Sequence, residues 1–305
     1  MIEFLLLFTG LALLYKSSSI VIGRAARLSE LTGISQLAIG FVFVAVATSL
    51  PELTVAVMSS FLDKGNMGFG VLAGSNIVNI TLVFGAMAIA GLKMKKEDFV
   101  SVDEAVIFTT AIAFFVLILG KTDFVFGIFS LILFYIFFRS VSRKSMGTGS
   151  SKGLKTIETV KSIIYILAAI AVVIISARIV VDSAVDIATL LGITEAVIGA
   201  LIISMGTALP ELSIGILAIR KGNPGLAIGD SIGSLAVNMT LILGLVSIIN
   251  PVTIDFASMF VFGFLILANL LFLFIVSRAR LGIFEGMILI LTYIMFLFST
   301  LMVFA

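Results

Sequence analysis

The stretch VATSLPELTVAV, from Val46 to Val57, places a proline and a glutamate inside a long apolar run. A glutamate near the middle of a bilayer costs roughly 2.5 kcal/mol or more on insertion scales. A proline removes a backbone hydrogen bond that hydrocarbon cannot replace. Both residues therefore need a structural or functional reason to be there, and the same combination, GTALPEL, recurs from Gly206 to Leu212.

The composition around these motifs is that of an integral membrane protein. Of 305 residues, 61% are hydrophobic and 12% are charged, and the mean hydropathy is +1.30. Apolar runs of about twenty residues, long enough to cross a bilayer as helix, follow one another along the chain. They predict an all-α polytopic protein with ten transmembrane helices, at residues 2–22, 34–62, 67–91, 100–119, 122–139, 157–180, 194–219, 225–249, 256–276 and 282–304.

The two halves of the chain repeat each other. The segment from Gly33 to Leu53 aligns without gaps to the segment starting at Gly192, an offset of 159 residues (33 to 192), and GSNIVNITLVFG at Gly74 matches GSLAVNMTLILG at Gly233 at the same offset. A polar, glycine- and serine-rich linker separates five spans from five, so the second half enters the membrane from the opposite side. We predict two inverted five-helix repeats, 1–141 and 157–305, joined by a linker at 142–156.

Basic residues gather in alternate loops, which predicts the orientation. The side that carries most of them, and with it the linker, is expected to be cytoplasmic, and both termini extracellular. The first span lacks a basic leader and a cleavage site, so we interpret it as retained. The chain is expected in the cell membrane with the lipid bilayer as its surroundings; it shows no basic soluble domain for nucleic acid and no evident obligatory protein partner.

The prolines explain what the motifs do. Pro51 and Pro210 lack the donor that a helix interior needs, so we predict that they break the second and seventh helices and free carbonyls one turn earlier. Irregular backbone at membrane depth is tolerated where it lines a cavity, and freed carbonyls there are cation ligands. The predicted carbonyl region comprises Ala47, Thr48, Gly206 and Thr207.

The remaining candidate ligands are side-chain oxygens. Glu52 and Glu211 follow the two breaks and are expected to face one another across the pseudo-two-fold axis. Asn79 and Asn238 add amide carbonyls. Ser75 and Ser234 lie four residues before those asparagines, on the same helical faces. Because the chain has no cysteine and no histidine, any ion shell uses oxygen alone, which suits Ca²⁺ and Na⁺.

Small polar residues in membrane helices more often mark close packing or hydrogen bonding to the preceding turn than ion ligands. For the two glutamates that alternative is weak, because a buried carboxylate needs a partner and neither helix offers a basic residue at that depth.

ATSLPEL with GSNIVNI, and GTALPEL with GSLAVNM, resemble the paired alpha repeats of the calcium/cation antiporter superfamily, in particular its sodium/calcium exchanger branch. The resemblance implies a non-enzymatic ten-helix antiporter without cofactor that exchanges Na⁺ for Ca²⁺ by alternating access. It also implies the ion ligands Thr48, Ser49, Glu52, Ser75, Asn79, Thr207, Glu211, Ser234 and Asn238, and helices one and six that slide against the others.

Three positions depart from the family pattern. Ala208 stands where serine is usual, so one hydroxyl is missing. Asn238 stands where potassium-dependent relatives have aspartate, which favours a potassium-independent exchanger. Asp230 stands where asparagine is usual; about 12 Å from Asn238 along a helix, it is expected outside the ion shell. A solvated helix start is the favoured interpretation, and a role at the cytoplasmic mouth is the alternative. A Ca²⁺/H⁺ antiporter with the same glutamates remains an alternative, and a cation channel a weaker one.

Overall fold

The computed structural model describes residues 2–61, 65–145, 156–190, 206, 208–278 and 281–304. Within them eight helices are long and apolar enough to cross a membrane, and a bent helix pair makes a ninth. The prediction of a mostly helical protein with several membrane-spanning helices is confirmed. Of the predicted seventh span, the described part is α12 (Leu209–Arg220) with Gly206 and Ala208 before it.

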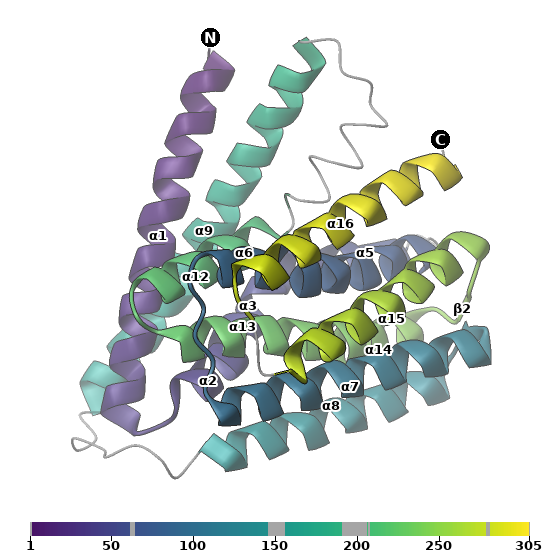
Figure 1. Cartoon of the computed structure of the whole chain (residues 1–305), viewed down its shortest axis with the longest axis horizontal. Coiled ribbons are helices and arrows are strands. Elements are labelled where there is room, and N and C mark those ends of the chain that lie inside the picture. Colours follow the sequence, from purple (N-terminus) through teal and green to yellow (C-terminus); the bar gives the residue numbers. More distant parts are fainter. Residues whose placement is uncertain are drawn as a thin grey trace.

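Two long helices, α1 (Ile2–Thr32) and α9 (Thr156–Leu190), pack against each other and lie at a steep angle to the other helices (Figure 1). Both continue well past the predicted ends at residues 22 and 180. The charged residues that suggested an earlier end of α1 are paired along its last turns: Arg24 stacks on the Tyr165 ring of α9 at 4.3 Å. Helix packing therefore overrides the local polarity.

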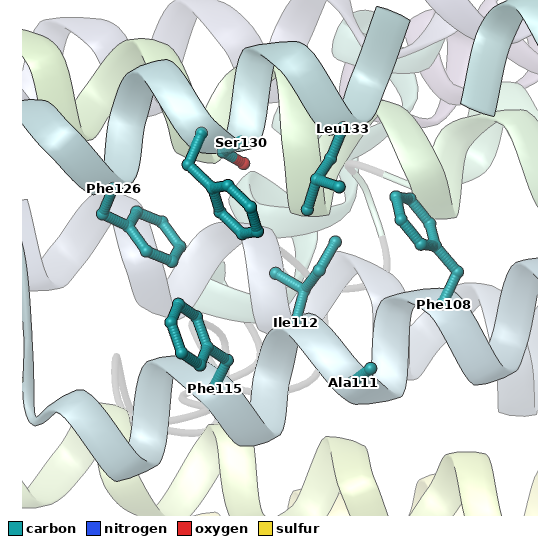
Figure 2. Close-up of a pocket in the computed structure, with 8 residues that line it drawn as sticks. Phe108, Ala111, Ile112, Phe115, Phe126, Ser130 and Leu133 are labelled. Atoms are coloured by element: carbon teal, nitrogen blue, oxygen red, sulfur yellow. The ribbon is translucent and has the colours of Figure 1, made fainter. Parts of the chain in front are cut away.

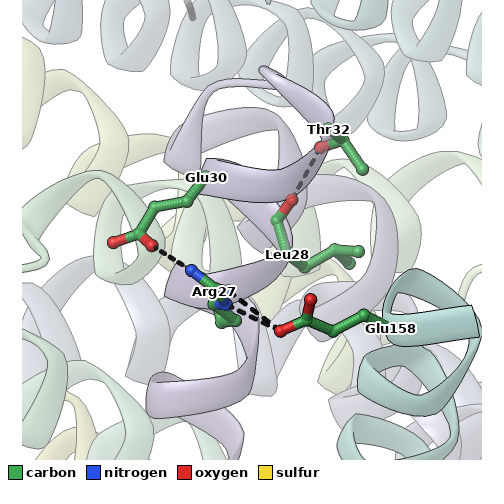
Figure 3. A network of polar contacts seen from close by, with 5 residues as sticks. All are labelled: Arg27, Leu28, Glu30, Thr32 and Glu158. Atoms are coloured by element: carbon green, nitrogen blue, oxygen red, sulfur yellow. Dashed lines mark hydrogen bonds and ion pairs between the residues drawn. The ribbon is translucent and has the colours of Figure 1, made fainter. Parts of the chain in front are cut away.

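A polar network ties the two long helices together at one end (Figure 3). The Arg27 guanidinium donates to Glu158 Oε1 from Nη2 at 2.9 Å and from Nε at 3.2 Å. Its Nη1 also donates to Glu30 Oε2 at 3.0 Å. Because Glu158 lies in the first turn of α9, the network joins the end of α1 to the start of α9.

The remaining helices form the body of the protein, with the buried apolar core between them. Those of the first half are α2 (Gln36–Ile39), η1 (Gly40–Ala45), α3 (Val46–Thr48), α4 (Leu50–Phe61), α5 (Gly65–Val78), η2 (Asn79–Val83), α6 (Phe84–Ile89), α7 (Lys96–Leu119) and α8 (Phe124–Ser145). Those of the second half are α12, α13 (Pro224–Ala236), η4 (Val237–Ile242), α14 (Leu243–Ile249), α15 (Phe256–Val276) and α16 (Ile283–Phe304).

The break in the second span lies just before Pro51 and not at it, which corrects the predicted position. The predicted break at Pro210 falls on a part of the chain that the structure describes only at Gly206 and from Ala208 onward. The segments on either side of Ser49 are bent by 41°, and Pro51 is the second residue of α4. Pro210 likewise stands in the first turn of α12. A proline is tolerated in a first turn because the missing N–H has no partner there in any case. The carbonyl of Ala47, four residues before Pro51, still loses its helical donor.

Glycine pairs bring helices into backbone contact at two places. A Cβ on Gly85 of α6 would lie 2.9 Å from the Gly286 carbonyl of α16, and a Cβ on Gly127 of α8 would lie 2.7 Å from the Gly244 carbonyl of α14. Small residues permit such close approach in membrane helices.

The loops meet in two groups at opposite ends of the body. At one end β1 (Lys121–Thr122) pairs antiparallel with β2 (Val252–Thr253), and Asn66 Nδ2 donates to the Thr253 carbonyl at 3.1 Å. At the other end Gln36 Nε2 donates to Asn223 Oδ1 at 2.9 Å. Each group joins loops that the distribution of basic residues assigns to the same side of the membrane.

Candidate ion-binding site

Glu52 and Glu211 lie in the first turns of α4 and α12, each directly after a proline, and each is 1% exposed. A first turn presents unpaired backbone N–H groups and the positive end of the helix dipole, which favours a carboxylate there. Glu211 is close enough to Glu52 for the two to interact electrostatically. The predicted convergence of the two acids is therefore present in the structure.

A hydrogen-bond network on the side of α5 holds Glu52 in place. Ser75 Oγ donates to Glu52 Oε1 at 3.2 Å. Asn238 Nδ2 lies 3.4 Å from Ser75 Oγ and donates to Asn76 Oδ1 at 3.0 Å. Asn76 Nδ2 in turn donates to the Leu235 carbonyl at 3.2 Å. The amide nitrogen of Asn238 is thus engaged by protein, while its carbonyl oxygen is left for another partner.

Several buried oxygens at this point have no hydrogen-bond partner within the described residues. They belong to Ser49 (Oγ), Glu52 (Oε2), Asn79 (Oδ1), Glu211 (Oε2), Asp230 (Oδ2), Ser234 (Oγ) and Asn238 (Oδ1). Buried polar atoms are nearly always paired in native proteins, so a group of unpaired acceptors needs an explanation. Cation ligands are such acceptors, because a hydrogen bond from protein would compete with the ion.

Hydroxyl groups elsewhere in the helices behave differently. Thr54 donates to the Leu50 carbonyl at 2.8 Å, and Ser247 to the Leu243 carbonyl at 2.8 Å. This is the ordinary bond of serine and threonine to the preceding helical turn. Ser49 and Ser234 make no such bond within the described residues. A packing role therefore fits Thr54 and Ser247, and it does not fit Ser49 and Ser234.

Asp230 of α13 is 0% exposed, and the prediction of a solvated helix start is wrong. Thr48 Oγ1 lies 3.1 Å from Asp230 Oδ1 and 3.2 Å from the Ala45 carbonyl. Thr48 also contacts Glu211, which interacts electrostatically with Asp230. The acid reaches the site through the contact of α13 with α3. The expected separation of about 12 Å from Asn238 applied only along its own helix. A charge inside the apolar run 225–249 was the sequence signal for it.

Widened helical turns place the two asparagines. The π-helical turn η2 begins at Asn79, and η4 begins one residue before Asn238. Such turns inside α-helices are frequent at functional sites, because they rotate side chains and loosen the backbone bonding. A third, η1, precedes Thr48 on the second span.

The site's negative charge is not balanced by protein. Among the described residues no lysine or arginine is buried, and the described ion pairs involve Arg27 and Arg178 with other acids. Three carboxylates in a buried position therefore need an external positive charge.

A cavity of about 150 Å³ lies beside the two prolines. It is lined by Pro51 and Pro210, each one residue before a site glutamate, and by a face of α9 that includes Ala177 and Arg178. A larger cavity of about 350 Å³ between α7 and α8 is lined almost entirely by apolar side chains (Figure 2). Its Ser130 hydroxyl donates to the Thr240 carbonyl at 2.9 Å, so that cavity offers no ligands to an ion.

The model of the family described as sodium/calcium exchanger protein matches residues 2–142 and 161–302. The chain belongs to the sodium/calcium exchanger family. Inner membrane protein YrbG of Escherichia coli is 31% identical to this exchanger-family chain, over 82% of the chain and 81% of YrbG. Sodium/calcium exchanger MaX1 of Methanosarcina acetivorans is 28% identical over 97% of both.

The fold of this family member is also that of a solved exchanger. The structure of the sodium-calcium exchanger NCX_Mj soaked with 10 mM Na⁺ and 10 mM Sr²⁺ matches it with a TM-score of 0.83 at 25% identity, over 96% of both chains. The family is one of transporters, in line with the prediction that the chain is not an enzyme.

In this exchanger-family chain the structure brings together most of the predicted ligands. Glu52, Glu211, Ser75, Asn238 and Thr48 are joined by the contacts above. Asn79, Ser49 and Ser234 are buried, each with an oxygen that has no partner in the described part of the chain. Ala47 and Gly206 lie four residues before Pro51 and Pro210 and offer only backbone carbonyls as candidate ligands. Thr207 lies outside the described residues. Sequence reasoning missed Asn76, which lies three residues before Asn79 in the same motif. Its role appears only through its hydrogen bond with Asn238.

Proposed function

We propose that the chain is a secondary antiporter that exchanges Na⁺ for Ca²⁺ by alternating access and does not require K⁺. The observation that carries the proposal is the pair Glu52 and Glu211, buried together in the first turns of two helices, each with an oxygen that has no partner among the described residues. Two carboxylates with neutral oxygens around them suit Ca²⁺, and they also suit Na⁺ when the ions share them. Na⁺ and Ca²⁺ sites that share the two glutamates cannot be filled at once, and exchange needs that exclusion.

Each ligand has a role in this proposal. Ca²⁺ binds between Glu52 and Glu211, with Asn79 and Asn238 supplying amide carbonyls. Na⁺ ions use the same carboxylates and the flanking oxygens. Those flanking oxygens come from Ala47, Thr48, Ser49, Ser75, Gly206, Thr207 and Ser234. The transported ions are substrates, and the antiporter works in the lipid bilayer without a cofactor, a nucleic acid or an obligatory protein partner.

Ten helices in two inverted repeats are part of the proposal. Support comes from contacts between residues one repeat apart: Asn76 bonds to Leu235, and Asn269 Nδ2 donates to Thr110 Oγ1 at 2.9 Å, both at a separation of 159 residues. Residues related by a two-fold axis touch one another where they lie on that axis. The glycine contacts also follow the repeat. Gly244 is the repeat partner of Gly85, and Gly127 is the repeat partner of Gly286, so the two contacts are related by the repeat.

In the proposed transport cycle, α1 and α9 move as one unit against the body. Their mutual packing and the Arg27–Glu158 ion pair make them a unit. The cavity beside Pro51 and Pro210 is the ion path from the outer side, because its α9 wall includes Arg178 of the predicted extracellular end. Both termini are extracellular and the linker is cytoplasmic in this orientation.

The proposal is tested by purified protein in liposomes with ⁴⁵Ca²⁺ uptake measured under an outward Na⁺, K⁺ or pH gradient in turn. We expect uptake that depends on the Na⁺ gradient and is unchanged by K⁺. Uptake driven by the pH gradient alone would identify a Ca²⁺/H⁺ antiporter. Uptake that continues without any counter-ion gradient would identify a channel. Either result would overturn Na⁺/Ca²⁺ exchange.

Ser49 and its repeat partner Ala208 provide a prediction about Na⁺. Ser49 Oγ is buried without a partner, and Ala208 is buried with no hydroxyl to offer. A neutral ligand contributes on the order of 1 kcal/mol, so Ala208→Ser should lower the Na⁺ concentration for half-maximal Ca²⁺ release several-fold, and Ser49→Ala should raise it. Ca²⁺ affinity should change little. If neither variant moves that midpoint, these positions serve packing.

Asn238→Asp should change the cation dependence of transport. The amide nitrogen of Asn238 donates to Asn76 Oδ1, and a carboxylate oxygen in its place would face that oxygen without a proton. A bound cation or a captured proton would relieve the repulsion. We expect new K⁺ sensitivity or stronger inhibition at low pH, measured as exchange across K⁺ and pH series. Curves superimposable on the wild type would place Asn238 outside the ion shell.

A further inference from the structure

Asp230 is an acid that the two-glutamate centre does not account for. It is fully buried, and its Oδ1 is held by the Thr48 hydroxyl. Its Oδ2 has no partner among the described residues. A structural aspartate would have both oxygens satisfied by donors, because a buried unpaired carboxylate oxygen is costly.

Neutral oxygens surround this carboxylate on two sides. Ser234 lies four residues further along α13, hence on the same helical face, and its buried Oγ is also unpaired. Thr48 sits at the end of α3, where the second span breaks, and touches both Asp230 and Glu211. The group thus combines one full negative charge with hydroxyl oxygens.

The three carboxylates do not converge on one point. Among the described residues no three acidic side chains are arranged to hold a single metal ion. Asp230 therefore does not complete the Ca²⁺ shell of Glu52 and Glu211. It lies to one side of that shell, with Thr48 between it and Glu211.

We propose that Asp230, Thr48 and Ser234 form a separate subsite for one monovalent cation, Na⁺, that stays bound when Ca²⁺ occupies the glutamate centre. The inference rests on the proposed function for the identity of the central ion. One carboxylate with neutral oxygens attracts a monovalent ion without the second charge that Ca²⁺ binding needs. Charge balance points the same way, since Ca²⁺ and one Na⁺ neutralise three carboxylates and Ca²⁺ alone leaves one uncompensated.

The test counts bound ions directly and needs no transport. Purified wild-type protein is dialysed against ²²Na⁺ at saturating Ca²⁺, with choline chloride keeping the ionic strength constant. We expect about one Na⁺ retained per chain, one charge for the one uncompensated carboxylate. A value near zero Na⁺ per chain overturns the proposal. Because this measurement uses only the wild-type protein, it does not depend on the folding of any variant.

Asp230→Asn locates the retained ion. We expect this variant to retain no ²²Na⁺ at saturating Ca²⁺. The Na⁺ concentration needed to displace ⁴⁵Ca²⁺ should rise about tenfold, and the Hill coefficient of that competition should fall by about one. Ca²⁺ affinity without Na⁺ should fall less than the Na⁺ competition does, because Thr48 stands between Asp230 and the glutamate centre. The matched control is Asp103→Asn, which removes another carboxylate with an unpartnered buried oxygen, in α7 and outside the site; it should behave as the wild type.

Two results for Asp230→Asn overturn the assignment. An unchanged Na⁺ count places the ion elsewhere, and an equal loss of Na⁺ and Ca²⁺ affinity makes Asp230 a ligand of the central site. Failure of the proposed function is recognised separately: a retained Na⁺ with no Na⁺-driven Ca²⁺ uptake in liposomes overturns the exchange and leaves the subsite standing.

Discussion

Glu52→Gln and Glu211→Gln will each reduce Na⁺-driven Ca²⁺ uptake to background while the protein remains folded. Removing a unit charge about 4 Å from a divalent ion, at an effective dielectric of 20, weakens the interaction by about 8 kcal/mol. Even a fraction of that loss abolishes measurable binding. Stability should hold or rise, because the neutral side chain no longer has to bury an uncompensated charge in the ion-free protein.

The measurements are ⁴⁵Ca²⁺ uptake in liposomes and the melting temperature in detergent without Ca²⁺. Glu97→Gln is the matched control, the same chemical change at an exposed acid in the first turn of α7, and should transport normally. Normal uptake in either site variant would show that the central ion lies elsewhere.

Gly229→Ala should be the most damaging of the conservative packing changes. A Cβ at this position would lie 2.1 Å from the Leu37 carbonyl oxygen and 2.9 Å from its carbon. The obstacle is helical backbone, which cannot move aside as a flexible side chain would. We expect a loss of about 1–3 kcal/mol or more, seen as a lower melting temperature and a smaller folded fraction in size-exclusion chromatography. The site should suffer too, because Asp230 is the next residue.

Gly70 is the matched control, since it is the repeat partner of Gly229 and a Cβ there meets no atom within 4 Å. Gly70→Ala should be neutral or slightly stabilising, because alanine favours a helix over glycine by about 1 kcal/mol. Equal behaviour of the two variants would contradict the close approach of α13 to α2.

Much of the fold is visible in local pattern. Runs of about twenty apolar residues have one structural solution in a bilayer, because every backbone polar group must be paired within the segment. The predicted span 256–276 coincides with α15, and 282–304 differs from α16 by one residue. The span ends went wrong at α1 and α9, where charged residues marked a boundary that packing between the two helices moved outward.

The site was predicted from the motif pairs, and the structure separates ligand candidates from packing residues among them. Thr54 and Ser49 are both hydroxyl residues close to Pro51 in the same apolar run. Thr54 nevertheless donates to the carbonyl of its preceding turn, and Ser49 Oγ has no partner among the described residues. The difference lies in the helix break, which changes the backbone that each hydroxyl can reach. No pattern of residue types contains that information.

By itself the sequence determined that the chain lies in a membrane, that its halves repeat, and that Glu52 and Glu211 each follow a proline inside an apolar run, because these are properties of short stretches and of their comparison. Only the tertiary structure decided which oxygens stay unpaired and that Asp230 joins the site. Asp230 and Thr48 are 182 residues apart in the chain. Their contact depends on how closely α13 approaches the second span, and that approach is set by packing between the two halves.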